Sequence, residues 1–79
     1  MKEDNINKLK EIFREVFELN IDDDIENARQ LNCKNWDSLT QINLINAIES
    51  EFEITIDTHE YERFTSYSAV ELLLEELKL

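Results

Sequence analysis

The sequence predicts an all-α protein, a small antiparallel four-helix bundle with three main helices, one short helix and a long loop between the first two helices. Three stretches carry apolar residues every three or four positions, and each such stripe would form one face of a helix. The chain has neither glycine nor proline, so residues such as Asn, Asp, Ser and Thr must form the turns and helix ends. Its 79 residues, 42% of them hydrophobic, suffice for one domain over residues 1–79 with a modest core.

The first helix is expected over residues 4–19, with Asp4 or Asn5 as its N-cap. Asn20 is its expected end, because Asn tolerates the left-handed conformation. The apolar stripe has the spacing of one helix face: Ile6, Leu9, Ile12, Phe13, Val16, Phe17 and Leu19. Charged residues fill most of the other face, so the segment is predicted to be amphipathic.

Residues 20–36 lose this period and predict a long connector, with room for a short helical turn near residues 23–29. Three isolated apolar residues are expected to pin the connector to the core: Ile21, Ile25 and Leu31. A loop of this length is unusual in so small a domain and tends to be functional.

Residues 38–52 predict the second main helix, whose broad apolar face is formed by Ile42, Leu44, Ile45, Ile48 and Phe52. Asp37 is a good N-cap for this helix. Ser38 with Gln41 also fits a capping box, which leaves the first helical residue open by one position.

The last third of the chain predicts a connector, a short helix and a final main helix. Ile54 and Ile56 are expected to anchor the connector, and Asp57 to open a short helix that turns Tyr61 and Phe64 inward. The final helix would follow one of three competing caps, Thr65, Ser66 or Ser68. Its stripe is formed by Val70, Leu73, Leu74 and Leu77.

The formal net charge of −11 is concentrated in the second half of the chain. Residues 37–79 contain ten acidic and two basic side chains, a net of −8, against −3 for residues 1–36. Such a surface repels nucleic acid and steers towards basic patches on proteins. No stretch approaches the roughly 20 apolar residues that span a bilayer, so we expect no stable membrane insertion. No signal peptide is recognised, and the single cysteine, Cys33, favours a reducing, cytoplasmic setting. We expect a monomer.

The sequence gives little support for a catalytic site or a metal-binding site. A nucleophilic serine needs a base within hydrogen-bond reach, and the single histidine, His59, is interpreted as a solvated surface residue. The run Asp22-Asp23-Asp24 lacks the alternating ligands and the glycine of a calcium loop. One cysteine and one histidine cannot form a structural zinc site. We therefore expect neither an enzyme nor a metal-binding protein.

Ser38 follows Asp37 at the start of the second predicted helix, and by itself it is a helix-starting serine that satisfies a free amide. Its surroundings indicate more: Asp37-Ser38-Leu39, then Ile42, Leu44, Ile45, Ala47, Ile48, Glu49 and Glu51-Phe52, then Ile54-x-Ile56 and Ser66-x-x-Ala69-Val70. This pattern resembles the acyl carrier protein family. The resemblance covers essentially the whole chain and is most specific from Trp36 to Ile56.

The resemblance implies that Ser38 is the attachment site of 4′-phosphopantetheine, moved from coenzyme A by a phosphopantetheinyl transferase, with Asp37 as flanking cap and partner contact. The thiol of the arm would hold acyl groups as thioesters. Partners would be an acyl- or aminoacyl-loading ligase and downstream transferases or synthases of fatty-acid, lipid, polysaccharide or secondary-metabolite biosynthesis. The acyl chain would lie between the apolar faces of residues 42–52 and 70–77.

The resemblance also implies a partner-docking surface on the second helix, formed by Leu39, Thr40, Asn43, Asn46, Ala47 and Glu49. Polar residues stand there where the family usually has acids, which indicates a specialised carrier. Lys34-Asn35-Trp36 stands where the family usually has a glycine. Trp36 packs beside the arm or, in the favoured interpretation, pins the loop to the bundle.

Two alternatives stay open from the sequence. An aminoacyl carrier, for example for D-alanine, shares the chain length and the Asp-Ser-Leu motif, and the thioester on the purified protein would separate the two. An acidic helical interaction module without a prosthetic group would bind a basic partner through Leu39, Ala47 and the surrounding polar face. Its binding would be unchanged by Ser38→Ala.

Overall fold

The computed structural model describes residues 1–20 and 23–79, and within them it contains helices and no strand. The three α-helices are α1 (Glu3–Phe17), α2 (Ser38–Phe52) and α3 (Tyr67–Glu76). Two short 3₁₀ helices, η1 (Ile25–Asn27) and η2 (Thr58–Arg63), lie in the connections. The predicted all-α fold is confirmed, with its long first connection, its short helix before α3 and its helical turn within residues 23–29.

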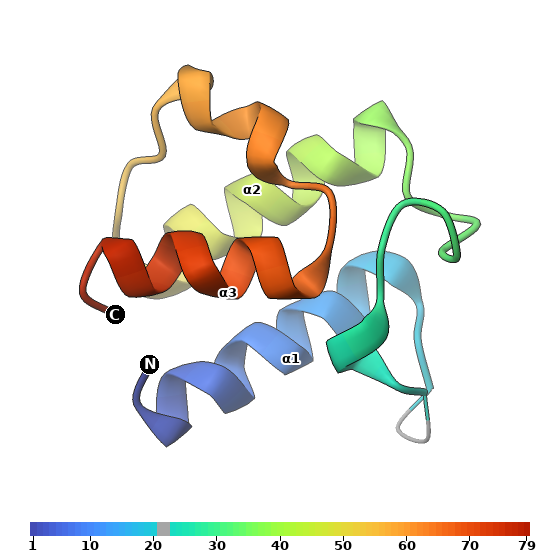
Figure 1. Cartoon of the computed structure of the whole chain (residues 1–79), viewed down its shortest axis with the longest axis horizontal. Coiled ribbons are helices and arrows are strands. Elements are labelled where there is room, and N and C mark those ends of the chain that lie inside the picture. The colour runs from blue at the N-terminus through green and yellow to red at the C-terminus, as the bar shows by residue number, and fades with distance from the viewer. Residues whose placement is uncertain (21–22) are drawn as a thin grey trace.

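The three α-helices do not all alternate in direction. Figure 1 shows α1 running against both α2 and α3, while α2 and α3 run the same way because η2 carries the chain back between them. The start of α1 lies beside the end of α3, where the N–H of Lys2 donates to the carbonyl of Leu79 over 3.3 Å. The predicted antiparallel packing therefore holds for α1 against the other two helices.

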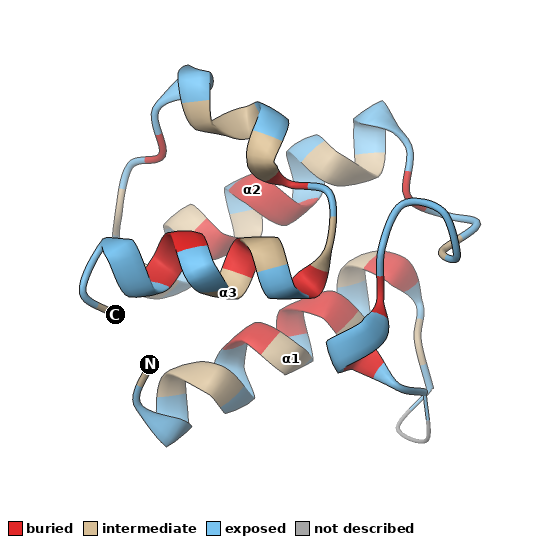
Figure 2. Ribbon diagram, viewed as in Figure 1, coloured by how far each residue is buried: buried red, intermediate tan, exposed pale blue. Residues whose placement is uncertain are grey.

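One apolar core joins all of these elements, and Figure 2 shows its buried residues on the surfaces that face one another. Phe13 lies at its centre, with its ring centroid 5.5 Å from Phe17, 5.8 Å from Trp36 and 5.2 Å from Tyr67. The predicted stripes supply most of the buried set: Leu9, Ile12, Phe13, Phe17, Leu44, Ile45, Ile48, Val70, Leu73 and Leu74. Ile56 and Phe64 are buried as predicted, and Ile54 and Tyr61 are half-buried.

Three apolar residues expected in the core are exposed instead. Leu31 is 93% exposed, so its predicted pinning role is wrong. Ile42 is 49% exposed on α2, and Leu77, the C-cap of α3, is 44% exposed. Of the other two predicted pins, Ile25 is buried and Ile21 lies outside the described residues.

The predicted ends of α1 are wrong at both termini. The helix begins at Glu3 after Lys2, whose side chain makes no capping bond, so Asp4 and Asn5 lie inside it. Asn5 instead donates through Nδ2 to the carbonyl of Leu79 over 3.0 Å. The helix ends at Glu18, which adopts the left-handed conformation at φ 55°, two residues before Asn20. Without glycine in the chain, an ordinary residue takes this conformation.

The other helix starts follow the predicted cap chemistry. Asp37 is the N-cap of α2, and the capping box joins it to Thr40, which decides against the alternative box of Ser38 with Gln41. Ser66 is the cap of α3, and its Oγ accepts from the N–H of Ala69 over 3.0 Å. Asp57 opens η2 by accepting from the N–H of His59 over 2.9 Å.

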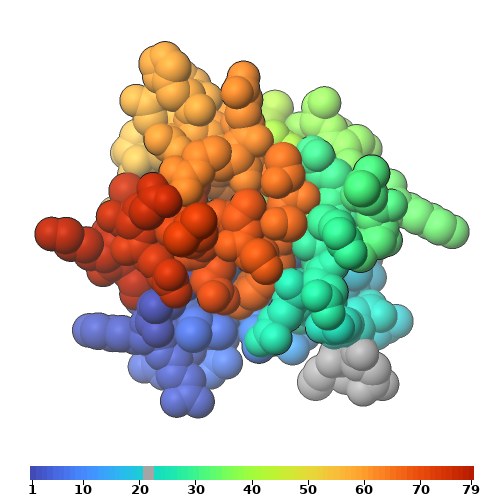
Figure 3. All heavy atoms as spheres, in the orientation of Figure 1, coloured from blue at the N-terminus to red at the C-terminus, as the bar shows by residue number. Residues whose placement is uncertain are grey.

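The long connector is fastened to the η2–α3 junction. The N–H of Gln30 donates to the carbonyl of Thr65 over 3.0 Å, and the N–H of Tyr67 donates to the carbonyl of Ala28 over 2.9 Å. In Figure 3 the connector accordingly lies against the chain that leads from η2 into α3. These bonds place the connector at the end of the bundle where α2 and α3 begin.

Candidate functional site

Ser38 is the first residue of α2, and its side chain is exposed. The turn that carries it is closed by a reciprocal pair of bonds. An Oδ1 atom of Asp37 accepts from the N–H of Thr40 over 2.9 Å, and the Oγ1 of Thr40 accepts from the N–H of Asp37 over 2.8 Å. The capping box fixes the backbone on both sides of Ser38, so its side chain leaves the chain at a defined point.

The segment just before Ser38 is tied to the end of α1. The hydroxyl of Thr40 donates to the carbonyl of Asn35, and Nδ2 of Asn35 donates to the carbonyl of Phe17 over 3.2 Å. Trp36 is buried and stacks on Phe17, which confirms the predicted pinning role. Ser38 therefore projects from a rigid base even though it follows a long connector.

The charge at this helix start is set by Asp37. The N–H of Thr40, followed by the Thr40 hydroxyl, lowers the pKa of the Asp37 carboxyl below its ordinary value. Asp37 is therefore ionised at neutral pH. It faces the positive end of the α2 dipole, where the first amides of the helix favour negative charge.

In the part of the chain that the structure describes, no hydrogen bond links the Ser38 hydroxyl to a base. The Nδ1 atom of His59, the single histidine, lies 2.7 Å from Oδ1 of Asp57, the N-cap of η2, and His59 is exposed as predicted. A nucleophilic serine requires a base within hydrogen-bond distance of its own oxygen.

The predicted docking residues divide into two groups. Leu39, which is 69% exposed, lies on the outward side of α2 with Asn43 and Asn46, and Ala47 is half-buried at its edge. Two others are engaged within the fold: Thr40 in the capping box, and Glu49, whose Oε2 accepts from the N–H of Ile56 over 2.8 Å.

Ile42 joins the exposed side of α2 four residues after Ser38, and the sequence analysis had placed it in the core. Residues four apart on a helix are surface neighbours, so the spacing to Ser38 could have indicated this position. Leu39 and Ile42 together flank Ser38 with exposed apolar surface.

Gln41, which the sequence analysis considered only as a capping-box partner of Ser38, has a different role in the structure. Its Oε1 accepts from Nε2 of Gln30 over 3.1 Å and from Nε1 of Trp36 over 3.4 Å, and its Nε2 donates to the carbonyl of Tyr61 over 3.1 Å. A glutamine in register with Leu44, Ile45 and Ile48 is a polar residue within an apolar stripe, and that was the signal for its role.

The apolar faces expected to shelter an acyl chain are packed against the core. Ile45, Ile48, Val70 and Leu74 are almost completely buried. An apolar groove of about 270 Å³ lies elsewhere, between the end of α3 and the chain that leads into η2, and is lined by Thr55, Ile56, Asp57, Glu60, Leu73, Glu76 and Leu77.

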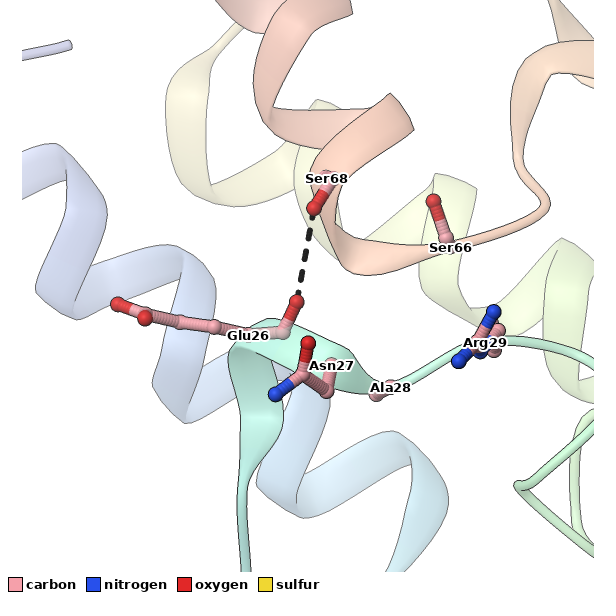
Figure 4. Close-up of a pocket in the computed structure, with 6 residues that line it drawn as sticks. All are labelled: Glu26, Asn27, Ala28, Arg29, Ser66 and Ser68. Carbon is pink, nitrogen blue, oxygen red and sulfur yellow. Dashed lines mark hydrogen bonds between the residues drawn. The ribbon is translucent and has the colours of Figure 1, made fainter.

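A second hollow, of about 250 Å³, lies between η1 and the start of α3 (Figure 4). Its polar groups mostly serve the fold. The Ser68 hydroxyl points at the carbonyl of Glu26, 3.5 Å away, and Ser66 caps α3. The rest of the lining consists of Glu26, Asn27, Ala28 and Arg29, of which Arg29 is basic.

In the acidic run before η1, the two residues that the structure describes accept hydrogen bonds within local turns. Asp23 accepts from the N–H of Asn20 over 2.7 Å, and Asp24 accepts from the side chain of Asn27 over 2.5 Å, while Asp22 lies outside the described residues. Within residues 1–20 and 23–79, no three carboxylate, histidine or cysteine side chains gather closely enough to hold a metal ion. In the same range, no helix combines the length and the apolar character that crossing a bilayer requires.

Comparison of the chain with protein-family models, with curated proteins and with solved structures finds no match. Function therefore has to follow from the site itself. Its main features are an exposed serine at a capped and anchored helix start, two exposed apolar neighbours, and a strongly acidic second half of the chain.

Proposed function

We propose that the chain is a carrier protein whose Ser38 hydroxyl receives 4′-phosphopantetheine from a separate phosphopantetheinyl transferase. In this transfer the Ser38 oxygen forms a phosphodiester with the pantetheine-bearing phosphate of coenzyme A. The pyrophosphate bond breaks, the adenosine bisphosphate half leaves, and the serine proton passes to the transferase or to water. The arm supplies a thiol that holds acyl groups as thioesters.

The position of Ser38 is the observation that carries this proposal. The side chain is exposed at the first residue of α2, so a transferase can reach it. The added phosphodiester would be negative, and the free amides at the start of a helix favour an anion. Asp37 is occupied in accepting from Thr40 and holds the turn in place. The residues present at this helix start therefore fit the group.

The surroundings of Ser38 fit recognition by other proteins. Leu39 and Ile42 offer exposed apolar contacts beside the attachment point. The net charge of −8 over residues 37–79 favours partners with basic docking patches. The partners we propose are the transferase, an acyl- or aminoacyl-loading ligase, and downstream transferases or synthases, all in the cytoplasm.

Intact-mass analysis tests the proposal directly. The protein is incubated with coenzyme A and a broad-specificity phosphopantetheinyl transferase, and we expect it to gain one phosphopantetheinyl group. Ser38→Ala should gain none. Ser50→Ala, which changes another exposed serine of the same helix, should gain the group as the wild type does. A modified Ser38→Ala protein, or a wild type that stays unmodified, would contradict the proposal.

A further inference from the structure

Gln41 forms a polar bridge between α2 and η2 one turn after Ser38. Its Nε2 donates to the Tyr61 carbonyl of η2 over 3.1 Å. Its Oε1 accepts from Gln30 and from Trp36, both in the connector. One half-buried side chain thus joins α2, η2 and the connector at the end of the bundle that carries Ser38. We call the line where α2 meets η2 at this end the seam.

Arg63, the last residue of η2, binds this helix to α3. Its two terminal nitrogens donate to the two carboxylate oxygens of Glu76 on α3, over 2.9 and 2.6 Å. Nη1 also donates to Glu60 over 2.9 Å. The paired geometry of a guanidinium and a carboxylate fixes orientation as well as distance. Bonds to both α2 and α3 therefore hold η2 in place.

The space behind the seam is filled with side chains. Ile45 and Ile48 of α2 and Phe64 after η2 are almost completely buried in the common core. Protein interiors are close-packed, so an alkyl chain entering here would have to displace them. It would also have to break the partly buried hydrogen bond between Gln41 and the Tyr61 carbonyl, which is unfavourable.

We propose that Gln41 seals the seam, so that a group carried on Ser38 stays outside the helix bundle. The carrier then takes short or polar acyl or aminoacyl groups in preference to long alkyl chains, because the space between α2 and η2 is closed to such chains. This inference rests on the proposed attachment of phosphopantetheine to Ser38. It makes Gln41 a specificity-determining residue that does not itself touch the reacting thioester.

The test compares cargo length in three proteins: the wild type, Gln41→Leu, and the control Ser50→Leu, which also replaces a polar side chain of α2 by leucine, at an exposed position away from the docking surface. Each is loaded with acetyl- or decanoyl-phosphopantetheine from the corresponding acyl-coenzyme A, and the Tm of each form is measured. We expect the same Tm for both cargoes in the wild type and in Ser50→Leu. In Gln41→Leu the decanoyl form should melt about 4 °C or more above the acetyl form, because the chain can then be buried.

A second measurement on the wild type keeps the test decisive if Gln41→Leu does not fold. On a hydrophobic-interaction column, the decanoyl form should be retained longer than the acetyl form, because its chain is exposed. A wild-type Tm that rises with chain length, or equal retention of the two forms, would overturn the sealed seam. Equal Tm values in Gln41→Leu would overturn the role of Gln41. If the mass spectrum shows that the wild type gains no phosphopantetheinyl group, the carrier function itself is overturned.

Discussion

The indole of Trp36 stacks on the ring of Phe17, with centroids 4.5 Å apart and an angle of 26° between the planes. This contact joins the end of α1 to the residue two positions before Ser38. Trp36→Ala should therefore lower the free energy of unfolding by about 3 kcal/mol, because it leaves a large cavity in the core. Urea denaturation followed by circular dichroism measures this loss.

Leu31→Ala is the matched control in the same connector. Leu31 is almost fully exposed, so its truncation should change the free energy of unfolding by less than about 0.5 kcal/mol. A large loss for Leu31→Ala together with a small one for Trp36→Ala would mean that the connector is fastened differently.

The capping carboxylate of Asp37 should make stability depend on acid pH. Its pKa is lowered in the folded protein, chiefly by the N–H of Thr40, so its stabilising contribution is complete above the unfolded pKa, near 4. The contribution is lost as the pH falls through the lower folded value. Asp37→Asn retains a capping oxygen but does not titrate there. We expect the wild type to lose its Tm advantage over Asp37→Asn below about pH 4.

Asp57 titrates in the same range, because the N–H of His59 lowers the pKa of its carboxyl. It is present in both proteins, so its effect cancels in the difference between them. A wild-type advantage over Asp37→Asn that does not change between neutral and acid pH would show that the Asp37 charge does not contribute to the cap.

The left-handed helix end at Glu53 should be improved by glycine. Glu53 follows α2 with φ 54°, a conformation that costs residues with a Cβ atom more than glycine. Glu53→Gly should raise the free energy of unfolding by about 0.5–1 kcal/mol, measured by urea denaturation. Glu51→Gly, inside the same helix, should lower it by about 1 kcal/mol. Destabilisation by both changes would argue against the left-handed cap.

The N-cap of α3 should contribute measurably to stability. The Ser66 hydroxyl accepts from the N–H of Ala69, so Ser66→Ala should cost about 1 kcal/mol. Ser68→Ala should cost little, because the Ser68 hydroxyl is exposed and its bond to Glu26 is long, at 3.5 Å. Thermal denaturation of the two variants side by side checks this, and the reverse order would place the cap at Ser68.

Local sequence signals predicted much of this fold. The second helix was expected over residues 38–52, and α2 spans those residues, because a regular apolar period and a strong cap residue act within a few positions of one another. Asp57 and Ser66 open their helices for the same local reason. The apolar period together with Asp37 placed Ser38 at a helix start to within one position.

Features that depend on distant partners could not be predicted in this way. Leu31 is exposed because the connector turns its backbone towards Thr65, and nothing near Leu31 in the sequence indicates that pairing. Gln41 binds groups from residues 30, 36 and 61, which only the folded chain brings together. The end of α1 at Glu18 goes against residue preference, since Asn20 was available two positions later.

The bond between Lys2 and Leu79 brings residues 1 and 79 together at one end of the bundle, while Ser38 lies near the end of α1 at the other. The 15 residues of α1 span about 22 Å between these two ends. A surface linkage or a fluorescent label joined through either residue 1 or residue 79 would thus be held away from Ser38. In copies immobilised in this way, Ser38 would stay accessible to added enzymes.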